Sequence, residues 1–204
     1  LTALYYGAIT CVDDYLGQLM DTLEANGQLD NTIIVFCADH GDNLGSHGLF
    51  NKNAVIEEAI RVPLIMAGPN VTAHVQPNTV NLVDVAPTLL AMVDQAPPHM
   101  QGEPIHQLPK VVSPDRATFI ETGRRIAIRT ATHMYALPYN EAERCITDGE
   151  PMFYDLRSDP YELINLAGSG KQSNLEATLR DRLIAWNESC SWMEHSTNPQ
   201  KAKA

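Results

Sequence analysis

The feature that most constrains the fold is an apolar run, Thr32–Cys37, which closely follows a long helical pattern. Apolar residues recur at helical spacing from Leu4 to Leu23, and Gly27 stands where a glycine commonly ends a helix. We therefore expect an amphipathic helix over Thr2–Asn26, a turn at Asp30–Asn31 and a strand over Thr32–Cys37. A strand that is apolar on both faces is typical of a covered, mostly parallel sheet. Helix, short turn and buried strand make half of an α/β repeat, so the sequence predicts the α/β class.

A glycine-rich loop that carries several reactive side chains follows this strand directly. Three glycines interrupt regular structure over Ala38–Lys52, and open α/β sheets place their ligand sites in loops at this edge. Asp39 and His40 can turn toward one metal ion, but a hard cation takes about six ligands, so most must come from elsewhere. Lys52 is a candidate for binding an anionic ester oxygen, and His47 for binding the same anion or protonating a leaving group. The same residues also fit a polar loop with capping aspartates, a loop histidine and a solvated lysine.

The rest of the first half continues the α/β pattern. Val55–Ile60 is predicted to form a short helical turn, and the segment RVPLIMAGP, residues 61–69, a second buried strand. Asp84 is predicted to cap a helix that has Pro87 in its first turn, where the missing N–H of proline costs nothing.

The pattern changes after a proline-rich stretch, Pro97–Pro114, which we interpret as an irregular connector and the internal boundary. Beyond it, the runs ATFIET, RIAIRTAT and HMYALPY have period-two character and predict an antiparallel sheet, with MFYDL as a further candidate strand. A final helix that covers this sheet is predicted from apolar residues at helical spacing: Leu175, Leu179, Leu183 and Trp186. The last residues, Ser196–Ala204, are predicted to be a frayed tail.

Composition excludes some classes of function. The formal charge of −11 argues against a nucleic-acid-binding protein, which usually presents a basic face. No apolar run approaches the length of a membrane span, so none is predicted. The 44% hydrophobic content is enough to build a core. Nothing in the sequence decides between a periplasmic or secreted location and a cytoplasmic one.

Four stretches, in order along the chain, resemble the type I sulfatases of the alkaline phosphatase superfamily, a group that includes arylsulfatases and iduronate sulfatases. They are YYGAITCVDDYLGQLMDTLEANGQLDNT, then DNTIIVFCADHGDNLGSHGLFNK with EEAIRVPLIMAGP, then VNLVDVAPTLLAMV, and finally MFYDLRSDPYELINLA. The resemblance implies the C-terminal part of an alkaline-phosphatase-like α/β/α sandwich plus a small α+β subdomain. In this interpretation residues 1–110 form the second half of the catalytic domain. Residues 111–204 form the subdomain, an antiparallel sheet packed by a C-terminal helix.

The resemblance also implies roles for the loop residues. Asp39 and His40 match the metal-binding pair of the family, although many members have Asn where His40 stands. Lys52 matches the lysine that contacts the sulfate and the leaving-group oxygen, a catalytic and substrate-binding role. His47 matches a loop histidine near the substrate with a less fixed role. The implied metal is Ca²⁺, and the imidazole of His40 keeps Mn²⁺ or Mg²⁺ open.

Several parts of the family's site are not found in this sequence. The nucleophile of the family is a formylglycine made within a Cys-x-Pro-Ser-Arg or Ser-x-Pro-Ser-Arg motif, and none of the four cysteines begins one. The first pair of aspartate ligands is also missing. We therefore expect the C-terminal portion of a sulfatase, with the formylglycine in the N-terminal half, and no hydrolysis by this chain alone. We also expect the chain to self-associate through an exposed sheet edge.

Two other functions stay open at this point. A phosphonate monoester or phosphodiester hydrolase of the same superfamily would share this loop, and relatives of that kind also carry histidine at the position of His40. A non-catalytic remnant or interaction module is the third possibility. The presence of Asp39, His40 and Lys52 favours an active parent enzyme with a small sulfate ester as its substrate.

Overall fold

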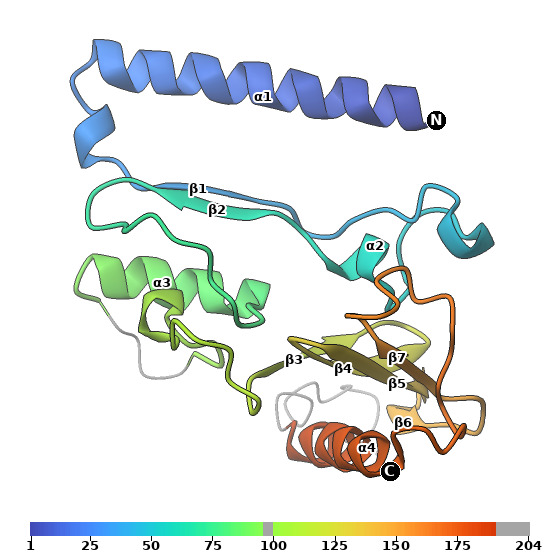
Figure 1. Cartoon of the computed structure of the whole chain (residues 1–204). Helices are drawn as coiled ribbons and strands as arrows, with labels where there is room; N and C mark the ends of the chain where they lie inside the picture. The colour runs from blue at the N-terminus through green and yellow to red at the C-terminus, as the bar shows by residue number, and fades with distance from the viewer. Residues whose placement is uncertain (96–99, 191–204) are drawn as a thin grey trace, which may run out of the picture. The chain divides into compact units, whose positions relative to one another are not determined.

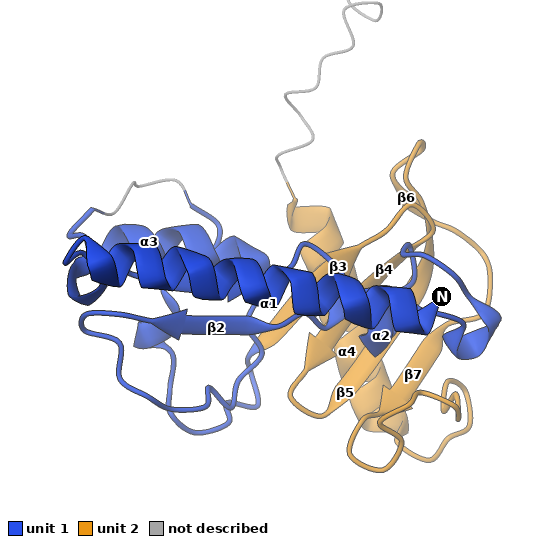
Figure 2. Ribbon diagram, turned by 90° about the horizontal axis from the view of Figure 1, so that it is seen from above, with its two compact units in different colours: residues 1–116 blue, residues 117–204 orange. Residues whose placement is uncertain are grey.

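The computed structural model describes residues 1–95 and 100–190, so Pro97, Pro98 and the predicted tail lie outside the described residues. The chain divides into two compact units, residues 1–116 and residues 117–204 (Figures 1 and 2). Each unit is considered by itself below. The catalytic and subdomain roles predicted for residues 1–110 and 111–204 stay predictions.

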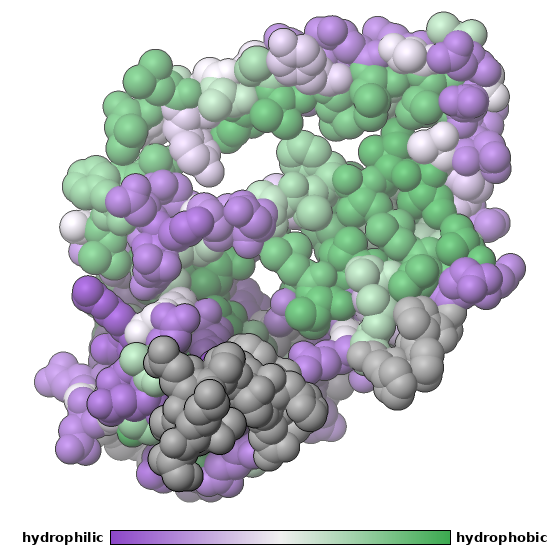
Figure 3. Space-filling model, turned by 180° about the vertical axis from the view of Figure 1, so that it is seen from behind, coloured by the Kyte–Doolittle hydropathy of each residue, from purple (hydrophilic) through white to green (hydrophobic). Residues whose placement is uncertain are grey.

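The first element, α1, spans Thr2–Ala25 and confirms the predicted helix to within one residue. It ends as its sequence predicts, because Gly27 takes a left-handed conformation with φ +65. The Gly27 N–H donates to the Glu24 carbonyl at 2.9 Å and the Gln28 N–H to the Leu23 carbonyl at 2.8 Å, which is a Schellman cap. Along α1, which is described throughout, no residue is buried. Hydrophobic residues gather on α1 and around β1, β2 and α3 (Figure 3). The self-association predicted from the sequence stays a prediction.

The strand β1, Ile34–Cys37, pairs with β2, Leu64–Ala67, and the two are antiparallel with Ile34 opposite Ala67. The expectation of a parallel arrangement is therefore wrong for this pair. The predicted burial of both strands is also wrong, since β1 and β2 contain no buried residue and Ile65 is 61% exposed. A continuous apolar run carries no information about strand direction. The chain between the strands holds a loop and one turn of helix, α2 at Glu57–Ile60, and doubles back instead of crossing over the sheet.

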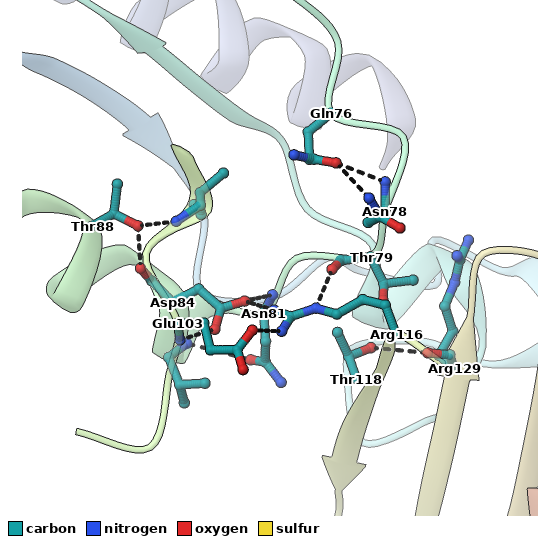
Figure 4. Close-up of polar contacts among 12 residues, drawn as sticks. Gln76, Asn78, Thr79, Asn81, Asp84, Thr88, Glu103, Arg116, Thr118 and Arg129 are labelled. Carbon is teal, nitrogen blue, oxygen red and sulfur yellow. Dashed lines mark hydrogen bonds and ion pairs between the residues drawn. The ribbon is translucent and has the colours of Figure 1, made fainter. Parts of the chain in front are cut away.

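The helix α3, Val85–Met92, follows a short 3-10 turn at Leu82–Asp84 and has Pro87 buried in its first turn, as predicted. Asp84 is its N-cap residue, but the prediction that its side chain caps α3 is wrong. The Asp84 carboxylate instead turns back to accept hydrogen bonds from the Asn81 N–H and the Glu103 N–H, each at 2.9 Å (Figure 4). It also pairs with the Arg116 guanidinium at 2.6 Å. The residue thus joins three chain segments of unit 1.

Unit 2 is an antiparallel sheet covered by one helix, as predicted. Its strand order is β3-β4-β5-β6, and β7 pairs with the first half of β5, on the side that faces away from β4. The elements are β3 Ala117–Glu121, β4 Arg125–Thr130, β5 His133–Asn140, β6 Cys145–Ile146, β7 Met152–Asp155 and α4 Ser173–Ser189. Leu179 and Leu183 of α4 are fully buried against the sheet, and Trp186 stacks on Phe119 with ring centroids 4.8 Å apart. None of the helices in the described ranges combines the length and the apolar character needed to cross a bilayer.

A buried histidine lies at the start of β5. The His133 ring is 4% exposed, accepts at Nδ1 from the Thr132 hydroxyl at 2.8 Å and donates from Nε2 to Gln172 Oε1 at 3.0 Å. Burial lowers the pKa of His133 below its ordinary value of 6.5, although the Asp155 carboxylate, with Oδ2 3.8 Å away, favours the charged form. The ring is therefore held neutral.

This burial predicts a pH dependence of stability. The unfolded chain takes up a proton near pH 6.5 while folded His133 resists it, so stability is lost as pH falls from there toward the lowered pKa. The free energy of unfolding in urea should fall between about pH 7.5 and about pH 5. The fall should be smaller in His133→Gln and unchanged in the exposed control His74→Gln. An identical fall in all three proteins would show that His133 is not responsible.

Candidate functional site

The loop between β1 and α2 brings together three of the four predicted site residues. The Lys52 Nζ lies 2.7 Å from His40 Nε2, although the two residues are twelve positions apart. His40 Nε2 also lies 3.3 Å from Asp39 Oδ2, and the backbone N–H of His40 donates to Asp39 Oδ1 at 2.9 Å. A carboxylate, an imidazole and an ammonium therefore share one small region of unit 1.

The hydrogen bonds of His40 assign its tautomer. His40 Nδ1 lies 2.7 Å from the Gly41 carbonyl, which only accepts, so Nδ1 carries the proton. The Lys52 ammonium only donates, so Nε2 accepts and presents its lone pair. A histidine that ligates a metal commonly has this arrangement, with the far nitrogen held by a backbone carbonyl and the near one free of hydrogen.

The pair of donors fits part of a metal site. The Asp39 side chain is 84% exposed and that of His40 is 37% exposed, so both are accessible. Within the residues that the structure describes, no group of three or more His, Cys, Asp or Glu side chains is placed to hold a metal ion. Asp39 and His40 could supply two ligands at most, and a hard cation would need the others from groups beyond this pair.

His47 is not joined to the other three residues. It lies in a short turn, Ser46–Gly48, with a left-handed backbone at φ 54. Within the described part of the chain, no hydrogen bond or ion pair to its imidazole is formed. Its role near a substrate stays a prediction.

Two residues that hold the loop were missed by sequence reasoning. Gly41 packs so tightly that an added Cβ would lie 2.0 Å from the Glu58 carbonyl oxygen, and its N–H donates to the Ala59 carbonyl at 2.8 Å. Asn43 is 1% exposed and bonds to the Asn51 carbonyl. In the sequence both look like ordinary turn residues, so neither gave a distinct signal.

The family comparison agrees with the loop and the fold around it. Residues 1–95 match the sulfatase family model. A choline-sulfatase of Rhizobium meliloti (strain 1021) is 32% identical over 185 residues, which cover 86% of this chain and 35% of that protein. This chain belongs to the sulfatase family.

Solved structures extend the likeness of this sulfatase-family chain to three dimensions. A protein solved in complex with its substrate D-glucosamine-2-N,6-O-disulfate has a TM-score of 0.73 and 29% identity, covering 88% of this chain and 39% of its own. A phosphonate monoester hydrolase of Agrobacterium radiobacter has a TM-score of 0.71 at 23% identity, covering 90% of this chain and 40% of its own. This second likeness shows the shared fold alone. The α/β class and the fold relationship predicted from the sequence are thus confirmed.

The chain spans between a third and two fifths of the length of the curated relatives it matches. The activity of a whole sulfatase is therefore a proposal for this chain. The roles of Asp39, His40, His47 and Lys52 as ligands or catalytic groups are proposals too.

Proposed function

We propose that this chain supplies part of the metal site and the leaving-group cation of a sulfatase that hydrolyses sulfate monoesters. The observation that carries the proposal is the 2.7 Å approach of the Lys52 ammonium to His40 Nε2, beside the exposed Asp39 carboxylate. A metal-ligand pair with a fixed cation at its edge suits an ester that is anionic and that gains charge on its leaving oxygen. The family membership supports the same reaction class.

Lys52 has two uses for its ammonium in this proposal. Without a metal it donates to the Nε2 lone pair of His40. The same nitrogen is the one that would ligate a metal ion, and the Lys52 protons would then be available for the substrate oxygens. Lys52 is proposed to neutralise the sulfate and the leaving oxygen, and Asp39 and His40 are the residues that would hold the cation.

The metal is proposed to be Ca²⁺, with Mn²⁺ or Mg²⁺ as alternatives because His40 adds a nitrogen donor. When bound, it would withdraw electron density from the sulfate oxygens. The carbonyl of Gly41 keeps His40 in the tautomer that this role needs. The nucleophile is proposed to be a formylglycine outside this sequence, since none of the four cysteines begins the motif from which it is made.

The proposed substrate is a small sulfate ester. One relative is named for choline sulfate, and one structural neighbour was solved with a disulfated glucosamine. A second candidate is hydrolysis of phosphonate monoesters, since a hydrolase of that name has the same fold.

The experiment is a comparison of substrates. The longer enzyme that includes this sequence should hydrolyse nitrophenyl sulfate with a kcat/KM at least about 100-fold above that for a nitrophenyl phosphonate monoester, a difference of about 3 kcal/mol in transition-state binding. The 204-residue chain alone should hydrolyse neither. A preference for the phosphonate would replace the first candidate with the second, and turnover by the purified chain alone would contradict the division of the site.

A further inference from the structure

Asn43 makes an unusual pair of hydrogen bonds at the base of the loop. Its backbone N–H donates to the Asn51 carbonyl at 3.0 Å, and its side-chain Nδ2 donates to the same oxygen at 2.6 Å. The residue is 1% exposed, and its Oδ1 has no hydrogen-bond partner among the described residues. Within the described ranges, the bond to the Asn51 carbonyl is therefore the one polar contact of this buried side chain.

These two bonds close a loop that does not favour its own conformation. Between its ends, Leu44 and His47 have left-handed backbones with φ 48 and φ 54, and Asn51 itself has φ 65. A left-handed backbone is unfavourable for residues other than glycine. The Ser46 N–H donates to the Asn43 carbonyl at 2.7 Å, so Asn43 is bonded on both its backbone donor and its backbone acceptor. The two bonds from Asn43 to the Asn51 carbonyl form what we call the clamp, which opposes the tendency of the loop to relax.

The ends of the clamp lie next to the site residues in the chain. Asn43 comes three positions after His40, and Asn51 comes directly before Lys52. The His40 side of the loop is fixed separately, because the Gly41 N–H donates to the Ala59 carbonyl. The clamp thus holds the backbone before Lys52 close to the backbone after His40, where the Lys52 Nζ lies 2.7 Å from His40 Nε2.

We infer that Asn43 is a positioning residue that sets the Lys52 ammonium against the Asp39–His40 pair. The inference rests on the function proposed above for these three residues. Asn43 touches neither metal nor substrate in this scheme, and acts through the Asn51 carbonyl on the backbone that leads into Lys52. A merely structural Asn43 would support the fold and leave the contact between Lys52 and His40 unchanged when replaced.

The test replaces the side-chain donor and keeps the volume. In the 204-residue chain, Asn43→Leu removes the side-chain bond to the Asn51 carbonyl and the unpartnered Oδ1, and it keeps the backbone bond from the residue 43 N–H, so the fold should tolerate it. The readout is the ¹⁵N spectrum of the histidine rings, recorded under one set of conditions for all variants. The His40 Nε2 signal of Asn43→Leu should move toward the position found in Lys52→Met, which lacks the ammonium altogether. The Nδ1–H tautomer should persist in both, because the Gly41 carbonyl is untouched.

Two controls separate positioning from general damage. Asn51→Gly keeps both the acceptor carbonyl and a residue suited to φ 65, so its His40 signals should match the unmodified chain. The ring signals of His133, which lies in unit 2, should stay unchanged in every variant. An Asn43→Leu spectrum with His40 at its original position would overturn the inference. If Asn43→Leu does not fold, Asn43→Ala removes the same donor with less bulk and is judged by the same signals.

A kinetic readout distinguishes this inference from the proposed function. In the longer enzyme, Asn43→Leu should lower kcat/KM about 10- to 100-fold, the loss expected from a misplaced catalytic group. In an enzyme that already carries Lys52→Ala, adding Asn43→Leu should lower kcat/KM no further, since the two changes remove the same contribution. Additive losses would contradict the coupling. Should the enzyme prove inactive on sulfate esters, the proposed function fails, while the His40 spectrum still decides the role of Asn43.

Discussion

Replacing Asp84 with alanine should lower the free energy of unfolding of this chain by about 3 kcal/mol. The Asp84 side chain is 3% exposed and pairs with the Arg116 guanidinium, which is 17% exposed, at 2.6 Å. Removing the carboxylate leaves a buried positive charge and takes the acceptor from the Asn81 and Glu103 N–H groups. We expect the lower end of the range for broken buried pairs because Arg116 keeps a second bond, to Glu103 at 2.6 Å. Urea unfolding followed by circular dichroism measures the change.

A pair with an exposed arginine shows whether burial of the arginine is responsible. The Arg61 side chain is 77% exposed and lies 3.8 Å from Glu57, whose side chain is 12% exposed, and Arg61→Gln should cost about 1 kcal/mol or less. A double-mutant cycle of Asp84→Ala with Arg116→Met should give a coupling of roughly 1–3 kcal/mol. A cost for Asp84→Ala no greater than that for Arg61→Gln would mean that the buried network does not stabilise unit 1.

Local signals in the sequence predicted local structure well. The end of α1 was predicted to within one residue, because it depends on Gly27 alone, which takes a left-handed conformation whatever lies elsewhere in the chain. The direction of β2 beside β1 and the contacts of Asp84 depend on partners far along the chain. Arg116 lies 32 positions from Asp84, and no periodic pattern links them. The two-residue strand β6, Cys145–Ile146, was missed because two residues have no detectable period.

The candidate site divides in the same way. Asp39 and His40 are neighbours in sequence, so the closeness of their side chains was open to prediction. The spacing of twelve residues to Lys52 says nothing about proximity by itself, and that expectation came from the resemblance to sulfatases. Asn43 was missed because a buried asparagine that holds a carbonyl eight residues away resembles any turn asparagine.

Replacing Lys52 with alanine in the longer enzyme should lower kcat for sulfate ester hydrolysis about 100- to 1,000-fold. The ammonium is proposed to stabilise charge that grows on the leaving oxygen, so its removal should act on kcat more than on KM. Lys52→Arg keeps the charge, but the planar guanidinium cannot place a single donor where the ammonium lies, so we expect partial recovery. Lys110→Ala removes the same charge at an exposed position and should change kcat less than about twofold.

The leaving group shows whether Lys52 acts at the proposed step. Nitrophenolate is a stable anion that needs little help to depart, whereas an alkoxide needs neutralisation of nearly a full charge. The loss in Lys52→Ala should therefore be at least about tenfold larger for an alkyl sulfate than for nitrophenyl sulfate. Equal losses for both esters would mean that Lys52 binds the sulfate in the ground state and transition state alike. In that case its 2.7 Å approach to His40 would mark a binding contact for the anion, and the stabilisation of the leaving oxygen would have to come from another residue of the longer enzyme.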